Sequence, residues 1–201
     1  MSDGGMSCDS EAYLVKDEVP SSMVGTIAAF EAILLCTLRP WTTDEKAFLI
    51  KGARFLIERQ LMHGSNTNYN ASERESAKKW MKLCFPRFYL YDVLRGLNAL
   101  LLWGEKTNQP IPREAYANVV ASIEERFPDG KIRIERHSFE GVGTILPSPH
   151  GEWIRKQPAT FFPLLIATSK IGEVSPFLSI QWANAKASLV YKKPRDRTSA
   201  K

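Results

Sequence analysis

Asp92 is the residue whose type and surroundings best suit catalysis in this sequence. It opens a predicted helix and stands among aromatic and basic side chains. A carboxyl group in an apolar cavity has a raised pKa and can protonate a ligand, which is general acid catalysis. A carboxylate at a helix N-terminus instead caps the helix, which stabilises the anion and opposes acid catalysis. We favour the cap, and Asp92 remains the single catalytic candidate.

The segment around Asp92 also supplies most of the candidate ligand-binding residues. Aromatic rings there could line an apolar pocket or stabilise a cation, although such rings more often belong to the core. Arginine side chains could bind a diphosphate group. The ligand-binding candidates in this segment are Trp80, Arg87, Tyr89, Tyr91 and Arg95.

A long region without helical periodicity, residues 131–158, adds two further candidates. Long loops in compact domains are often functional. We expect this one to form a lid over a cavity, with His137 as a ligand-binding residue and Trp153 as its apolar plug. The alternative is an ordered surface loop. His137 and His150 do not have the spacing of metal ligands, so neither a metal nor another cofactor is expected.

The composition is that of a globular protein with a sizeable core. The chain has 201 residues, of which 44% are hydrophobic and 24% charged, with 12 glycines, 12 prolines and three cysteines. These values favour one domain and exclude collagen-like, disordered and disulfide-scaffold classes. No apolar run approaches the roughly 20 residues of a membrane span, and no signal peptide is evident. We therefore expect a cytoplasmic protein without a transmembrane segment.

The net charge of +5 is concentrated at the C-terminus. Five basic residues within residues 192–201, against Asp196 alone, account for +4 of it. Such a tail can contact nucleic acid or anionic lipid, but a solvated and disordered terminus is more common. No aromatic residue or glycine is interleaved with the charges, as a stacking RNA-binding segment would need, so no nucleic-acid partner is expected.

Apolar periodicity predicts an all-α protein with no strand ladder. Ser21 or Ser22 can cap the first helix, Pro40 ends it and Thr43 can cap the second. Pro112 suits the first turn of a later helix. The predicted helices cover residues 23–38, 44–61, 73–83, 91–106, 112–127, 159–171 and 176–191. Residues 1–191 are expected to form one domain.

An internal repeat relates these predicted helices. A shift of 67 residues places Ala32–Leu35 on Ala99–Leu102, so the helix pair within residues 23–61 recurs within residues 91–127. A third pair within residues 159–191 has weaker identity. Glycine turns precede the three pairs, at Asp3-Gly4-Gly5, His63-Gly64 and Asp129-Gly130. Repeated helical hairpins of this kind form a curved array; a solenoid and a plain bundle with chance similarity are the alternatives.

Several segments resemble the repeats of a known superfamily. Asp3–Cys8 resembles a repeat signature of Asp-Gly-Gly followed by an aromatic residue, with Met6 where tryptophan is usual. The other matching segments are residues 21–34, 52–61, 83–101 and 127–135. Together they resemble the α/α-toroid superfamily of terpenoid (squalene-type) cyclases and protein prenyltransferases, in particular the bacterial squalene-cyclase-like and prenyltransferase-like proteins. The resemblance implies a partial α/α toroid, the C-terminal part of the ring only.

The catalytic motifs of these enzymes are missing from the sequence. Class II cyclases protonate an alkene with an Asp-x-Asp-Asp motif, and protein prenyltransferases bind zinc through an Asp-x-Cys pair; neither occurs here. The resemblance therefore implies a helical protein that binds an apolar ligand, an isoprenoid for example, in its concave face, without the motifs that catalysis would need. The alternative is a protein-interaction module, or a truncated toroid completed by self-association as a homo-oligomer.

Overall fold

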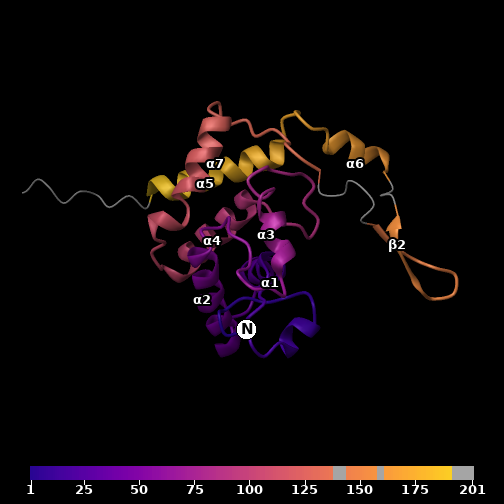
Figure 1. Ribbon diagram of the computed structural model, residues 1–201. Helices are drawn as coiled ribbons and strands as arrows, with labels where there is room; N and C mark the ends of the chain where they lie inside the picture. The colour runs from indigo at the N-terminus through magenta and orange to yellow at the C-terminus, as the bar shows by residue number, and fades with distance from the viewer. Residues whose placement is uncertain (138–143, 158–160, 192–201) are drawn as a thin grey trace, which may run out of the picture.

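The computed structural model describes residues 1–137, 144–157 and 161–191 of the chain (Figure 1). This part of the chain is mostly helical, which confirms the all-α class in its coarse form. The predicted basic tail, residues 192–201, lies outside the described residues. Among the described helices, none combines the length and the apolar character needed to cross a bilayer.

The first two α-helices begin at side-chain caps. A short 3₁₀ helix, η1 (Glu11–Leu14), precedes α1 (Met23–Cys36), where the hydroxyl of Ser22 accepts a hydrogen bond from the third helical residue. In α2 (Thr43–Glu58) the cap is Thr42 rather than Thr43, and it forms a capping box with Glu45. Helix α1 ends two residues before the predicted Leu38. The Leu38 side chain is 98% exposed and does not belong to the core face.

The middle of the chain contains shorter helices around one long helix. They are α3 (Ala71–Ala77), α4 (Val93–Thr107), the 3₁₀ helix η2 (Arg113–Ala115) and α5 (Ala117–Arg126). Helix α4 ends at Asn108, which has a φ of +53° in the left-handed region that often terminates helices. Helix α3 is six residues shorter than predicted at its C-terminal end and starts two residues earlier.

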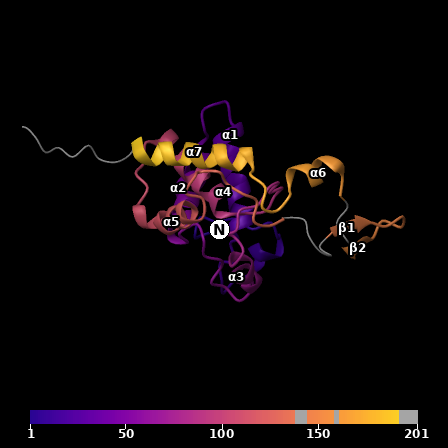
Figure 2. The ribbon, with the colours of Figure 1, turned by 90° about the horizontal axis from the view of Figure 1, so that it is seen from above.

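Helix α4 is the centre of the fold. Helices α1, α2, α5 and α7 (Pro176–Tyr191) all pack against it (Figure 2). Its leucines supply much of the buried core, together with Ile27 and Phe30 of α1, Leu56 of α2 and Trp182 of α7. Because α4 is covered from several sides, its N-terminal cap lies in the interior of the protein.

The C-terminal third differs from the prediction. It contains an antiparallel hairpin of β1 (Thr144–Pro147) and β2 (Trp153–Gln157), although no strands were expected. The helix α6 (Pro163–Thr168) is six residues long and, within the described chain, packs against no other helix or strand. Figures 1 and 2 both show α6 and the hairpin to one side of the helical body. The predicted third hairpin of helices is therefore not formed by α6 and α7.

Two Asp-Gly turns share the same local hydrogen bonds. Asp3 Oδ1 accepts from the backbone N–H of Gly5, and Asp129 Oδ1 accepts from that of Lys131, each at 3.0 Å. The glycine after each aspartate has a positive φ, +87° at Gly4 and +72° at Gly130. Asparagine and aspartate side chains commonly bond two residues ahead in this way, and glycine adopts positive φ without steric cost.

Each Asp-Gly turn also makes equivalent hydrogen bonds to a helix. The residue three positions after the aspartate accepts, through its backbone C=O, from the backbone N–H of the serine that caps the helix. The backbone N–H of the same residue donates to a side-chain hydroxyl in the first turn of that helix. These bonds join Met6 to Ser22 and Thr26 in α1, and Ile132 to Ser175 and Ser179 in α7, at 2.8–3.0 Å. Helices α1 and α7 thus enter the fold through equivalent contacts.

Candidate functional site

Asp92 is the N-cap of α4 and is completely buried. Its Oδ1 accepts from the backbone N–H of Arg95 at 2.9 Å, and its Oδ2 accepts from Arg87 Nε at 2.6 Å and from the N–H of Cys84 at 3.2 Å. The carboxylate therefore satisfies buried donors and has no access to a bound ligand. This geometry is that of the helix cap, and it provides no acid for a reaction at a cavity.

The two arginines expected to bind a diphosphate are both used inside the protein. Arg87 pairs with Asp92 and donates through Nη1 to Gln181 Oε1 of α7 at 2.7 Å. Arg95 pairs with Glu31 of α1 and also donates to two backbone carbonyls. Both side chains tie α4 to its neighbours.

The aromatic candidates do not form one site. Trp80 and Tyr91 are buried, with ring centroids 5.0 Å apart in an edge-on contact, and burial raises the pKa of Tyr91 well above its ordinary value. With His137 they line a cavity of about 520 Å³ whose rim carries Lys79, Lys82 and Arg136. The Tyr89 side chain is 69% exposed and lies outside this cavity. Three of the predicted ligand-binding residues therefore share a cavity, and the others do not.

Trp153 does not lie over a cavity, as the predicted lid would require. Its side chain is 68% exposed on β2, on the hairpin that stands to one side of the body. It plugs no cavity, because β2 pairs only with β1 among the described elements. The Nε2 atom of His137 lies 2.7 Å from the carbonyl oxygen of Ser169, which fixes the ring against the chain that follows α6.

The three cysteines are free thiols in different surroundings. Cys8 and Cys36 are exposed. Cys84 is buried, and burial together with the nearby Asp92 carboxylate raises the pKa of its thiol to about 12. A thiol in this state is protonated at neutral pH and unreactive.

A cleft between α2 and the end of α4 has a mostly apolar lining. Its volume is about 590 Å³, within the ~300–1,000 Å³ typical of small-molecule sites. The apolar lining consists of Trp41, Leu49, Ile50, Ile57 and Trp103. Ile50 is 57% exposed. We call this cavity the α2–α4 cleft.

The rim of the α2–α4 cleft is mainly basic. Lys46 and Arg54 come from α2 and Lys106 from α4, against the single carboxylate of Glu58. None of these four side chains forms an ion pair with another described residue. At the wall, the buried indole N–H of Trp103 has no hydrogen-bond partner in the described part of the chain. The cleft therefore offers apolar contact together with unpaired cations.

Sequence reasoning missed this cleft. Its signal is a stripe along α2 at a spacing of four residues, formed by Lys46, Ile50, Arg54 and Glu58. Residues four apart share one face of a helix. An isoleucine among charged residues on such a face is an exposed apolar position.

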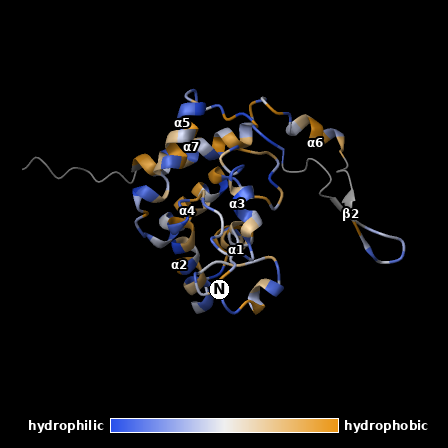
Figure 3. Ribbon diagram, in the orientation of Figure 1, coloured by the Kyte–Doolittle hydropathy of each residue, from blue (hydrophilic) through white to orange (hydrophobic). Residues whose placement is uncertain are grey.

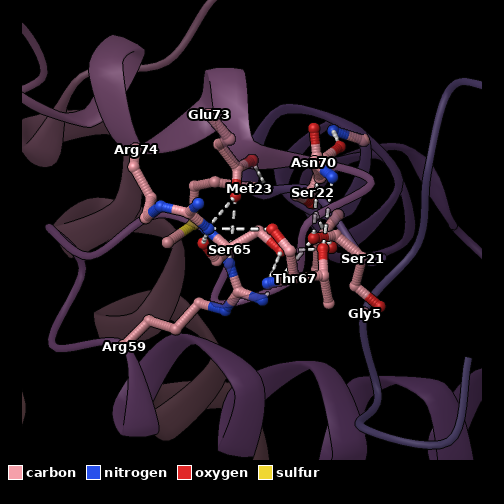
Figure 4. A network of polar contacts seen from close by, with 12 residues as sticks. Gly5, Ser21, Ser22, Met23, Arg59, Ser65, Thr67, Asn70, Glu73 and Arg74 are labelled. Atoms are coloured by element: carbon pink, nitrogen blue, oxygen red, sulfur yellow. Dashed lines mark hydrogen bonds and ion pairs between the residues drawn. The ribbon is translucent and has the colours of Figure 1, made fainter. Parts of the chain in front are cut away.

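Glu73 forms a second buried polar centre, which joins three segments (Figure 4). Its Oε1 accepts from the backbone N–H of Met23 at the start of α1, and its Oε2 from that of Ser65, each at 2.6 Å. Arg59 Nη1 donates to Oε2 at 3.0 Å. Burial raises the pKa of Glu73, and the bonds from these donors oppose that rise without cancelling it.

The raised pKa of Glu73 predicts an unusual pH dependence for Glu73→Gln. A carboxyl whose pKa is higher in the folded state contributes stability below its unfolded pKa and loses it as the pH rises through the folded pKa. The substitution should therefore destabilise the protein more near pH 4, just below the unfolded value of about 4.3, than at neutral pH. Denaturant unfolding at both pH values measures this difference.

Glu45 provides a control of opposite sign for the Glu73 prediction. Hydrogen bonding to Arg39 lowers the pKa of Glu45 to about 2. The effect of Glu45→Gln should therefore shrink as the pH falls below the unfolded value, which is about 4.3. If Glu73→Gln followed the same trend, the ion pair with Arg59 would outweigh burial and the assigned direction would be wrong.

Metal binding has no support from the described residues. They contain no group of three or more histidine, cysteine or acidic side chains arranged to hold an ion. The prediction that neither metal nor cofactor is bound stays a prediction, because residues 138–143 and 158–160 lie outside the described structure.

Comparison with known proteins identifies no relative of the chain. No protein-family model, curated protein or solved structure matches it. The resemblance to α/α toroids therefore remains an expectation from the sequence motifs alone.

Proposed function

We propose that the protein binds an apolar small molecule carrying an anionic group, and that the ligand occupies the α2–α4 cleft. The observation that carries this proposal is the combination of an apolar lining containing two tryptophans with three unpaired basic side chains. Small-molecule sites commonly have mostly apolar walls and a few polar groups that orient the ligand. The proposal keeps the apolar ligand predicted from the sequence and places it at different residues.

The charges on the rim favour an anionic group on the ligand. Lys46, Arg54 and Lys106 outnumber the one carboxylate, and their side chains are exposed. An anion placed among them gains charge-assisted hydrogen bonds at little desolvation cost, because these cations have no ion-pair partner to give up among the described residues. A fatty acid and an isoprenoid phosphate share this chemistry.

We also propose that the helices belong to an array of the α/α-toroid type. The matched contacts at Asp3 and Asp129 support this proposal, because each Asp-Gly turn leads through equivalent hydrogen bonds to a helix packed on α4. In such an array α1, α4 and α7 form one layer and α2 and α5 the other. The α2–α4 cleft would then lie beside the outer layer rather than in the concave face.

Binding of oleate tests the proposed ligand class. Oleate combines an apolar chain with a carboxylate, and oleyl alcohol has a similar chain without the charge. We expect calorimetry to show tighter binding of oleate, and Ile50→Glu to weaken it by about tenfold or more, since it places a carboxylate against the apolar lining. Lys106→Gln should reduce the preference for oleate over the alcohol.

Two substitutions outside the cleft serve as matched controls. Leu38→Glu puts the same charge at an exposed leucine, and Lys51→Gln removes a lysine of α2 that does not line the cleft. Both should leave oleate binding unchanged. Equal binding of oleate and oleyl alcohol, or equal effects of Ile50→Glu and Leu38→Glu, would contradict the proposal.

A further inference from the structure

The segment from α6 to the start of α7 exposes an unusual amount of apolar surface. Leucine, isoleucine and phenylalanine side chains about half or more exposed recur along residues 162–180. They are Phe162, Leu164, Ile166, Ile171, Phe177 and Ile180. We call these six side chains the apolar segment. Figure 3 shows the apolar residues of α6 in the ribbon beside the helical body. Scattered exposed leucines are ordinary on protein surfaces, but a concentration of this kind marks an interaction site.

The body of the protein holds one end of this segment in place. Backbone hydrogen bonds join Ile134 to Glu173 and Gly172, and Ile132 to Ser175. Helix α6 has less support: it has six residues and packs on no other described helix or strand, and Leu165 is its one buried residue. A helix this short is not stable in isolation, because helix nucleation is unfavourable and helices below about 12 residues are marginal in water. A surface that covers α6 would supply the missing packing.

We infer that a second copy of this chain covers the apolar segment, so that the protein is a dimer joined through residues 162–180. The exposed area suits this occupant. Six half-exposed side chains of this size present on the order of 500 Å² of apolar surface. One partner of a standard interface buries about 800 Å², of which roughly 65% is apolar in homodimers.

The charge of the segment also favours a second copy. Residues 161–185 contain only two charged side chains, Lys170 and Glu173, and these pair with each other at 2.9 Å. A surface without net charge can meet its own copy across a two-fold axis without repulsion. Residues 161–185 thus lack the several basic residues that segments lying on anionic membranes carry on their own polar face, although Ile171 lines a cavity together with Lys79, Lys82 and Arg136.

The molecular mass in solution tests this inference. We expect sedimentation equilibrium to give twice the mass of one chain in the micromolar range. Leu164→Glu combined with Ile166→Glu should reduce the mass to that of one chain, since the two carboxylates charge both flanks of α6, whichever flank the second copy covers. Both positions are exposed, so the variant should keep the helical circular-dichroism spectrum and the unfolding transition of the wild type.

A double substitution elsewhere separates a specific contact from a general effect of charge. Leu14→Glu with Leu38→Glu adds the same two carboxylates at exposed leucines outside the segment and should leave the dimer intact. A monomeric wild-type protein, or equal dissociation of both variants, would overturn the inference. So would flotation of a monomeric wild type with phosphatidylcholine vesicles that is lost in the Leu164→Glu, Ile166→Glu variant, because the occupant would then be a membrane.

The dimer and the ligand site are tested independently. The apolar segment contributes no side chain to the α2–α4 cleft. The Leu164→Glu, Ile166→Glu variant should therefore bind oleate as the wild type does, and Ile50→Glu should leave the mass unchanged. Either proposal can fail while the other holds.

Discussion

Arg87→Met should destabilise the protein by about 3–5 kcal/mol, the cost of removing one partner from a buried ion pair. Asp92 is completely buried and Arg87 is its ion-pair partner, at 2.6 Å. Without the guanidinium, the carboxylate keeps its hydrogen bonds from Arg95 and Cys84 but has no compensating charge. The substitution also removes the bond to Gln181 that links α4 to α7. Urea unfolding followed by circular dichroism measures the loss.

A second substitution distinguishes the buried charge from simple loss of packing. Asparagine caps helices as well as aspartate does and carries no charge. In a double variant that carries both substitutions, Asp92→Asn should therefore restore much of the stability that Arg87→Met alone loses. Arg95→Met is the comparison for a less buried pair, because its partner Glu31 is partly exposed, and it should cost less than Arg87→Met. Equal losses in Arg87→Met and Arg95→Met, or no recovery with Asp92→Asn, would contradict this account.

The helices that the sequence predicted best are those whose signals are local. Periodic apolar residues and a capping side chain define α1, α2, α4 and α7 to within a few residues. The β-hairpin was missed because Trp153–Gln157 has no alternation of apolar and polar residues, so the period of a strand is absent. The prediction of a third helical hairpin was wrong because its signal was also incomplete. The apolar residues of α6 indicate a helix, but not what the helix packs against.

The candidate site depended more heavily on tertiary contacts. That Asp92 could cap a helix was visible from its position, but the partners of Arg87 were not, because Gln181 lies 94 residues further along the chain. Ile50 lies among charged residues on its face of α2, and only the packing of α4 shows that it borders a cleft. Likewise, the two Asp-Gly turns were recognised as motifs, whereas their common contacts with α1 and α7 are non-local hydrogen bonds.

Those two turns allow a direct test of what each glycine contributes. Gly4→Ala should cost about 2–5 kcal/mol, which combines the strain of an L-residue at positive φ with overpacking. A Cβ atom at this position would lie 2.3 Å from the carbonyl oxygen of Lys51 in α2, and φ is +87°. Because the obstacle is helix backbone, either the turn or α2 must move. Thermal and urea unfolding of the variant measure the cost.

Gly130→Ala is the matched control, since Gly130 follows Asp129 as Gly4 follows Asp3 but has more space around it. Its φ is +72°, but the nearest atom to an added Cβ is Lys186 Nζ at 3.6 Å, an ordinary contact. Only the conformational strain remains, about 1–2 kcal/mol. A larger loss for Gly4→Ala would therefore measure the close approach of the first turn to α2. Equal losses of stability in the two variants would mean that α2 moves to accommodate the added methyl group. The Asp3-Gly4-Gly5 turn would then be held mainly by its hydrogen bonds to α1.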